Sequence, residues 1–239
     1  MHTNTPKSEV YNMDCLAAMR EMPDNAFDLA IVDPPYGIGE DGSKGVRTSP
    51  SRPNSYHRKP KHKPKGWDKS APSKDYFIEL LRVSKNAIIF GANHFIENIQ
   101  NQNTPCWIVW DKKNEGTDFA DCELAWSNMK TTVRKFTMHK FEGTRGGKDC
   151  IHPTQKPIAL YKWLLSNYAK QGDRILDTHL GSGSSRIAAY DMGFDFVGYE
   201  LDAEYFDAMN KRFAAHISRP AMFAPDEMYQ IEQKKLFET

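Results

Sequence analysis

The chain has 239 residues, of which 39% are hydrophobic and 26% charged, and its formal net charge is +1. This composition suits a globular protein of one large or two small domains and excludes wholesale disorder. No run approaches the roughly 20 apolar residues that span a bilayer, and the first ten residues lack the apolar stretch of a secretory signal. We therefore expect a cytoplasmic protein with no membrane contact.

The four cysteines are scattered along the chain, at Cys15, Cys106, Cys122 and Cys150. None belongs to a C-x-x-C pair or has a neighbouring histidine at a spacing typical of zinc ligands. We expect reduced thiols and no metal site.

Short apolar segments typical of buried strands alternate with helical patterns along the chain. The predicted strands are residues 27–32, 86–91, 106–110, 123–126, 174–176 and 194–199. The predicted helices are residues 76–83, 158–168, 186–192 and 203–215. The alternation predicts an α/β fold with a mainly parallel sheet, helices on both faces, and chemistry at the carboxyl ends of the strands.

The turn Asp33-Pro34-Pro35-Tyr36 directly follows the predicted strand that ends at Val32. Its two prolines stiffen the turn and leave carbonyl oxygens free to accept hydrogen bonds. The aspartate adds a carboxylate acceptor, and the tyrosine adds a flat face. Such a pocket suits the amino group and ring of an extruded adenine or cytosine, and the alternative is a rigid turn that only ends a strand.

Residues 43–74 contain ten Lys or Arg and a single Asp, a net charge of +9 against −8 for the rest of the chain. Five prolines and few aliphatic side chains predict a mobile loop, which could bind a polyanion by releasing its counterions. The alternative is a solvated loop without a partner. The candidate DNA contacts are Arg47, Arg52, Arg58, Lys59, Lys61, Lys63 and Lys65.

A loop with two glycines, residues 177–184, follows the predicted strand at Ile175 and opens a helix. Glu200 ends the next strand, at an offset that suits the hydroxyls of a ribose, so the pair predicts a nucleoside-bearing cofactor. Arg186 stands where the third glycine of a dinucleotide loop belongs. Asp177 at the mouth of the loop would repel a pyrophosphate but suits a cationic cofactor, which disfavours a nicotinamide oxidoreductase.

These motifs, together with His152-Pro-Thr-Gln-Lys-Pro157 and Gly198-Tyr199-Glu200, resemble the S-adenosylmethionine-dependent DNA amino-methyltransferases. The family methylates N6 of adenine or N4 of cytosine. The catalytic motif precedes the cofactor loop here, which is the circularly permuted order of the β group. The resemblance covers about residues 9–213 and is strongest to members encoded by bacteriophages. It also implies the family's association with restriction–modification.

The resemblance implies a Rossmann-like methyltransferase fold with a seven-stranded, mostly parallel sheet that includes a short strand over residues 9–13. It also implies a single domain over residues 1–216. A basic DNA-binding loop over 39–74 and a short target-recognition region over 111–150 belong to that domain. Residues 217–239 are expected to form a C-terminal tail.

The resemblance also assigns roles to individual residues and names S-adenosylmethionine as the cofactor. The expected catalytic residues are Asp33, Pro34, Pro35 and Tyr36. The expected cofactor-binding residues are Asp14, Lys156, Pro157, Asp177, Gly181, Ser182, Gly183, Ser184 and Glu200. The family's Asp-Pro-Phe is Asp177-Thr178-His179 in this chain, so we expect altered packing of the loop.

The predicted activity is methyl transfer to N6 of an adenine flipped out of double-stranded DNA. N4-cytosine methylation is the alternative within the family, although an Asp at position 33 favours adenine. An inactive DNA-binding protein on the same fold is the alternative from another class. Gln233, Leu236 and Phe237 match the short peptide that docks on the replication sliding clamp, against the alternative of a frayed tail. We expect a monomer or a homodimer.

Overall fold

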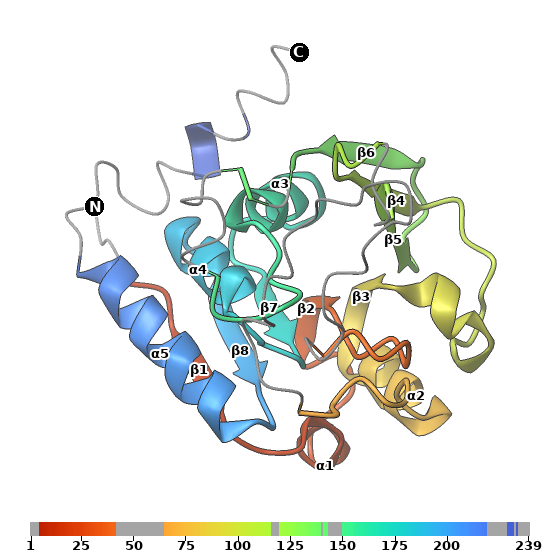
Figure 1. The fold of residues 1–239 in the computed structure, drawn as a ribbon, viewed down its shortest axis with the longest axis horizontal. Helices are drawn as coiled ribbons and strands as arrows, with labels where there is room; N and C mark the ends of the chain where they lie inside the picture. The colour runs from red at the N-terminus through yellow and green to blue at the C-terminus, as the bar shows by residue number, and fades with distance from the viewer. Residues whose placement is uncertain are drawn as a thin grey trace, which may run out of the picture.

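The computed structural model describes residues 5–41, 65–115, 120–139, 141–142, 150–218, 229–231 and 233. In this part of the chain, helices lie on both faces of one central sheet (Figure 1). The strands are β1 Ser8–Tyr11, β2 Phe27–Val32, β3 Ser84–Phe90, β4 Trp107–Asp111, β5 Cys122–Ser127, β6 Arg134–Thr137, β7 Arg174–Asp177 and β8 Asp195–Tyr199. The helices are α1 Cys15–Arg20, α2 Lys74–Val83, α3 Ile158–Tyr168, α4 Ser184–Asp191 and α5 Ala203–Ile217, with short 3-10 turns at Ala92–His94 and Ile96–Asn98.

The described strands form one sheet in the order β1-β8-β7-β2-β3-β5-β4-β6. The five strands from β1 to β3 in this order are parallel, β5 is antiparallel to both of its neighbours, and β6 is parallel to β4. The predicted α/β fold with a mainly parallel sheet is confirmed, but the expected count of seven strands is wrong. The eighth strand, β6, reads Arg-Lys-Phe-Thr at the edge of the sheet and is largely exposed, so it gives no apolar signal.

The centre of the sheet is formed by strands that the sequence marks as continuous apolar runs. β2 lies between β7 and β3. Its last four residues, from Leu29 to Val32, are all buried. Leu29 and Ile31 pack with α3 and α4 on one face, whereas Ala30 and Val32 pack with α1 and α2 on the other. This period of two is what a strand covered on both faces requires.

The topology brings three segments to one edge of the sheet. β2 and β7 are adjacent and parallel, with Leu29 opposite Ile175, so the segments that follow both strands leave at the same edge. β5 runs the other way, so its first residues, from Cys122 onward, lie at that edge too.

The C-terminal part of the chain returns to the core. α5 ends at Ile217, one residue past the predicted domain boundary. Tyr229 is buried, its hydroxyl donates to the carbonyl of Ala169 at 3.1 Å, and its ring lies edge-on to Phe194. Among the described helices none is both long and apolar enough for a membrane span, and the described side chains offer no cluster suited to a metal ion.

Candidate active site

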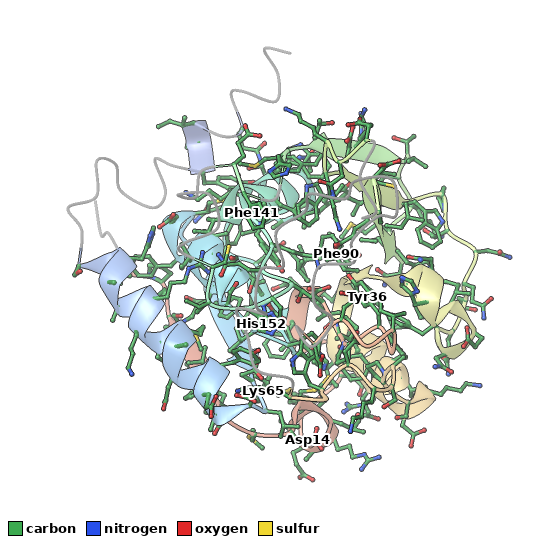
Figure 2. All side chains as sticks on the ribbon, viewed as in Figure 1. Asp14, Tyr36, Lys65, Phe90, Phe141 and His152 are labelled. Carbon is green, nitrogen blue, oxygen red and sulfur yellow. The ribbon has the colours of Figure 1, made fainter. Side chains whose placement is uncertain are left out.

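The turn after β2 holds its aspartate and tyrosine against one another. The Tyr36 hydroxyl donates to Asp33 Oδ1 at 2.7 Å, and the Tyr36 ring stacks on His94, with 5.2 Å between ring centroids. Tyr36 is labelled in Figure 2, at the end of β3 and beside β2. A carboxylate oxygen has room for two hydrogen bonds, so Asp33 keeps acceptor capacity for a further donor.

Gly91 directly follows β3, the strand next to β2, and lies against the Tyr36 ring. It has a φ of +68°, and a Cβ built on it would lie 2.1 Å from Tyr36 Cε1. Only glycine meets both the left-handed backbone and the close approach, so this residue fixes where the tyrosine ring lies.

Lys156, a predicted cofactor residue, directs its ammonium to the turn after β2. Its Nζ lies 2.6 Å from Asp33 Oδ2 and 2.9 Å from Glu123 Oε2, and its side chain is 2% exposed. The same ammonium lies over the ring of Phe90, which is labelled beside Tyr36 in Figure 2. The carbonyl oxygen of Lys156 accepts from Ser184 Oγ at 2.8 Å, so the backbone of this residue faces the glycine loop.

Glu123 is a site residue that the sequence did not indicate. It lies in β5, within the segment assigned to target recognition, and Lys112 forms an ion pair with its second oxygen, Oε1. Burial acts to raise the pKa of Glu123, but Lys156 and Lys112 outweigh burial and lower that pKa to about 2. The residue is therefore an anion at neutral pH. A charged residue within an otherwise apolar strand was the available signal.

The glycine loop after β7 is tied to the end of β8. The Gly181 N–H donates to Glu200 Oε2 at 2.8 Å, and the Asp202 N–H donates to Glu200 Oε1 at 2.9 Å. Burial raises the pKa of Glu200, while these backbone donors act to lower it. The predicted pair of glycine loop and acid is thus one connected unit at the carboxyl ends of β7 and β8.

Asp177 lies at the base of this loop and is 1% exposed. Its carboxylate accepts from Ser185 Oγ at 2.5 Å and from the His179 N–H at 3.0 Å, and both donors are uncharged. Burial therefore raises its pKa to about 7, despite these hydrogen bonds. A buried carboxylate whose donors are neutral suits a cationic ligand.

The two serines of the loop bond within the protein. Ser182 Oγ and Ser184 Oγ lie 3.2 Å apart, and Arg212 of α5 donates to the Ser182 carbonyl at 2.7 Å. Both serines are buried, as is Gly183, which lies between them. The Ser184 hydroxyl also donates to the Lys156 carbonyl, just before α3, and accepts from Arg212, so it holds the loop against both helices.

Thr178 and His179, which stand at the Pro and Phe positions of the family's Asp-Pro-Phe, are held by polar contacts. Thr178 Oγ1 lies 2.6 Å from the Tyr76 hydroxyl of α2 and 3.0 Å from His179 Nδ1. Burial lowers the pKa of His179 to about 4, so its ring is neutral at pH 7. The two polar side chains at these positions therefore bond to each other, and Thr178 also bonds to α2.

Two predicted cofactor residues occupy helix starts near the loop. Asp14 follows β1 and caps α1, accepting from the Leu16 N–H at 2.9 Å, and its charge acts on the pKa of His179. Pro157 directly precedes α3. Figure 2 labels Asp14 at the lower edge of the molecule, by α1.

The C-terminal end of the basic segment lies against the cofactor side of this edge. His152 approaches Gly181, with its ring 3.6 Å from the place of a Cβ, and lies between the rings of Trp67 and Tyr205. Lys65, a predicted DNA contact, forms ion pairs with Asp202 at 2.6 Å and with Glu204 at 2.9 Å. Its charge is therefore balanced within the chain.

The other predicted DNA contacts lie outside the described residues, and they are Arg47, Arg52, Arg58, Lys59, Lys61 and Lys63. Leu236 and Phe237 of the clamp-like peptide lie outside them as well. The side chain of Gln233 donates to the carbonyl of Ser166, so the first position of that peptide has a partner within the chain.

The residues at this edge fit S-adenosylmethionine, which carries a ribose and a positively charged sulfur. Glu200 directly follows β8, at the position suited to ribose hydroxyls, and the Gly181 N–H donates to it. Asp177 supplies a buried carboxylate whose donors within the described part of the chain are neutral. The loop glycines let the backbone approach a ligand closely.

Comparisons with known proteins agree with this geometry. A DNA methylase family for N6 and N4 methyltransferases matches residues 92–211, half of the chain. The type II methyltransferase M2.MboI of Moraxella bovis is 23% identical over 85% of this chain and 86% of its own length. Two solved structures share the fold at low identity. M1.HpyAVI in complex with SAM has a TM-score of 0.55 at 19% identity, over 85% of this chain and 98% of its own.

The second structure, the cytosine-N4-specific PvuII DNA methyltransferase, has a TM-score of 0.57 at 13% identity, over 99% of this chain and 95% of its own. The M1.HpyAVI complex carries the cofactor expected here. The family match, the shared fold, and the adjacency of the turn after β2 and the glycine loop after β7 agree on one family. The chain belongs to the DNA methylases that use S-adenosylmethionine to methylate the exocyclic amino groups of DNA bases.

Proposed function

We propose that the chain methylates the exocyclic N6 amino group of an adenine that is flipped out of double-stranded DNA. The observation that carries this proposal is the adjacency of two turns. The turn with Asp33 follows β2, and the glycine loop follows β7, its parallel neighbour. An amine held at the first turn therefore lies beside a cofactor held at the second.

The exocyclic amine is a poor nucleophile because its lone pair is delocalised into the ring. Hydrogen bonds from its N–H groups to the Asp33 carboxylate and the Pro34 carbonyl would localise that lone pair on nitrogen. The sulfonium cofactor supplies an activated methyl group, so the chain's own contribution is to hold amine and methyl in line and to accept the N–H hydrogens.

Tyr36 would form the stacking platform for the flipped base. Its ring is fixed by the hydrogen bond to Asp33, by the stack on His94 and by the close fit over Gly91. A platform held on three sides loses little freedom when a base stacks on it, which favours binding.

N4-cytosine methylation is the second candidate, because one structural neighbour is a cytosine-N4-specific enzyme. Both bases present an exocyclic amine beside a ring nitrogen, so the same acceptors would serve either one. Asp rather than Ser at position 33 is the feature that favours adenine. An inactive DNA-binding protein is disfavoured because Asp33, Tyr36 and Glu200 are all present in one site.

Transfer of a radiolabelled methyl group to DNA, followed by nucleoside analysis of the product, tests the proposal. We expect N6-methyladenine from the wild type, and no transfer by Asp33→Ala with cofactor affinity retained. N4-methylcytosine as the product would select the second candidate. Absence of transfer by the wild type, or normal transfer by Asp33→Ala, would refute the assignment of this site.

A further inference from the structure

Glu123 and Lys156 form a charged cluster that the mechanism above leaves unused. The Lys156 side chain is 2% exposed, whereas the carboxylate side chains of Asp33 and Glu123 are 16% and 19% exposed. Lys156 therefore lies beneath the two carboxylates, which are the groups that open toward the site. Buried charges are costly unless they are paired, so the cluster has to be accounted for.

The ammonium of Lys156 has three N–H donors and three oxygen partners. It lies 2.6 Å from Asp33 Oδ2, 2.9 Å from Glu123 Oε2 and 3.3 Å from the Tyr36 hydroxyl. All three donors are thus used, and the position of the ammonium is fixed by side chains from three separate segments. Asp33 is held by this ammonium at one oxygen and by Tyr36 at the other.

The charges of the cluster balance. Asp33 and Glu123 contribute two negative charges, and Lys156 and Lys112 contribute two positive ones, with Lys112 paired to Glu123 Oε1. Without Glu123, Lys156 would be a one-to-one partner of Asp33 and its ammonium would lose one of its three anchors.

We propose that Glu123 is a positioning residue for Asp33 that acts through Lys156: it holds the lysine's ammonium in place, so that the Asp33 carboxylate keeps one orientation and free acceptor capacity. This inference rests on the proposed function. It adds a residue from the antiparallel strand β5 to a site otherwise formed by parallel strands. Lys156 is a positioning residue for the same reason.

The pKa of Asp33 distinguishes this positioning role from a purely structural one, because a purely structural role would not change it. Burial raises the pKa of Asp33, Lys156 lowers it, and Glu123 raises it. The ionisable groups that interact electrostatically with Asp33 from the elements around it are Tyr36, Tyr76, Glu123, Lys156, Tyr161 and Asp177. Since ionised Asp33 is the better acceptor, the acid limb of the methyl-transfer rate should follow this pKa.

The test measures the pH profile of the single-turnover rate of methyl transfer to DNA. We expect Glu123→Gln to move the acid limb to lower pH and to reduce the plateau rate by on the order of tenfold, because the ammonium is held less firmly. We expect Lys156→Met to move the limb to higher pH. If either limb stays in place or moves in the opposite direction, the proposal is wrong.

Glu79→Gln is the matched control, because Glu79 is also 19% exposed and ion-paired, but to Arg82 on α2. Its acid limb should coincide with that of the wild type. If Lys156→Met does not fold, the double variant Glu123→Gln/Lys156→Met replaces it, and its limb should lie above that of Glu123→Gln. Failure of this test with an active wild type and an inactive Asp33→Ala would overturn the role of Glu123 and leave the proposed function intact.

Discussion

Asp177 links the affinity for a cationic cofactor to pH through one buried carboxyl group. Burial raises its pKa to about 7, so the group is neutral below that pH and ionised above it. A positively charged sulfur is attracted to the ionised form. Its binding therefore favours loss of the proton, and affinity should rise as pH increases through about 7.

We expect the affinity for S-adenosylmethionine to fall by about tenfold between pH 8 and pH 6, as one proton is taken up by Asp177. Asp177→Asn keeps the acceptor for the His179 N–H but cannot ionise, so its affinity should be lower at pH 8 and nearly flat across this range. Calorimetric titration at several pH values measures both. An equally steep change in Asp177→Asn would assign the titration to another group.

The turns that follow β2 and β3 are packed so closely that one element fixes the other. Gly91→Ala would place a Cβ 2.1 Å from Tyr36 Cε1, so the tyrosine ring has to move away from Asp33. We expect the rate of methyl transfer to fall by at least tenfold, because a displaced platform misplaces the base. Cofactor affinity should change little, since Asp177 and Glu200 lie on other strands. Single-turnover rates and cofactor titration measure the two effects.

Gly172→Ala is the control for this change. Gly172 also has a positive φ, at +92°, but a Cβ there would meet nothing within 4 Å. Both variants carry the backbone strain of about 1–2 kcal/mol, and only Gly91→Ala adds the collision with the ring. Equal losses of methyl transfer in the two variants would show that strain, and not the position of Tyr36, governs the rate.

The elements that the sequence predicted are those whose signal is local. β2 and β7 are buried apolar runs, and the polar turns that follow them carry the recognisable motifs. β6 was missed because an exposed edge strand has no apolar pattern. Glu123 was missed because its function depends on β5 lying antiparallel beside β3, a pairing that no local pattern in β5 encodes.

The side chain of Lys156 shows the same limit within a correctly identified motif. The motif lies at the site as expected, with its backbone bonded to Ser184 of the glycine loop. The ammonium pairs with Asp33 and Glu123, which the spacing of the motif did not indicate. Spacing along the chain locates a lysine, but the distribution of charge around it decides where its ammonium points.

Charge is divided unevenly over the whole molecule, with +9 on residues 43–74 and −8 on the remainder. DNA should therefore be attracted to one segment and repelled by most of the rest, which restricts how the duplex can approach. Lys65 lies at the end of that segment, but its charge is neutralised by Asp202 and Glu204. It should contribute less to the attraction than a lysine whose charge is not balanced within the chain.

This division predicts the salt dependence of DNA binding. Neutralising the six basic residues outside the described part should reduce the slope of log affinity against log salt by up to about five, if each contacts one phosphate. These residues are Arg47, Arg52, Arg58, Lys59, Lys61 and Lys63. Lys65→Gln should leave the slope as in the wild type, because this lysine is already paired within the chain. Fluorescence anisotropy over a salt series measures both. An unchanged slope in the sixfold variant would move the phosphate contacts to another surface, and a reduced slope in Lys65→Gln would mean that DNA displaces Asp202 and Glu204 from this lysine.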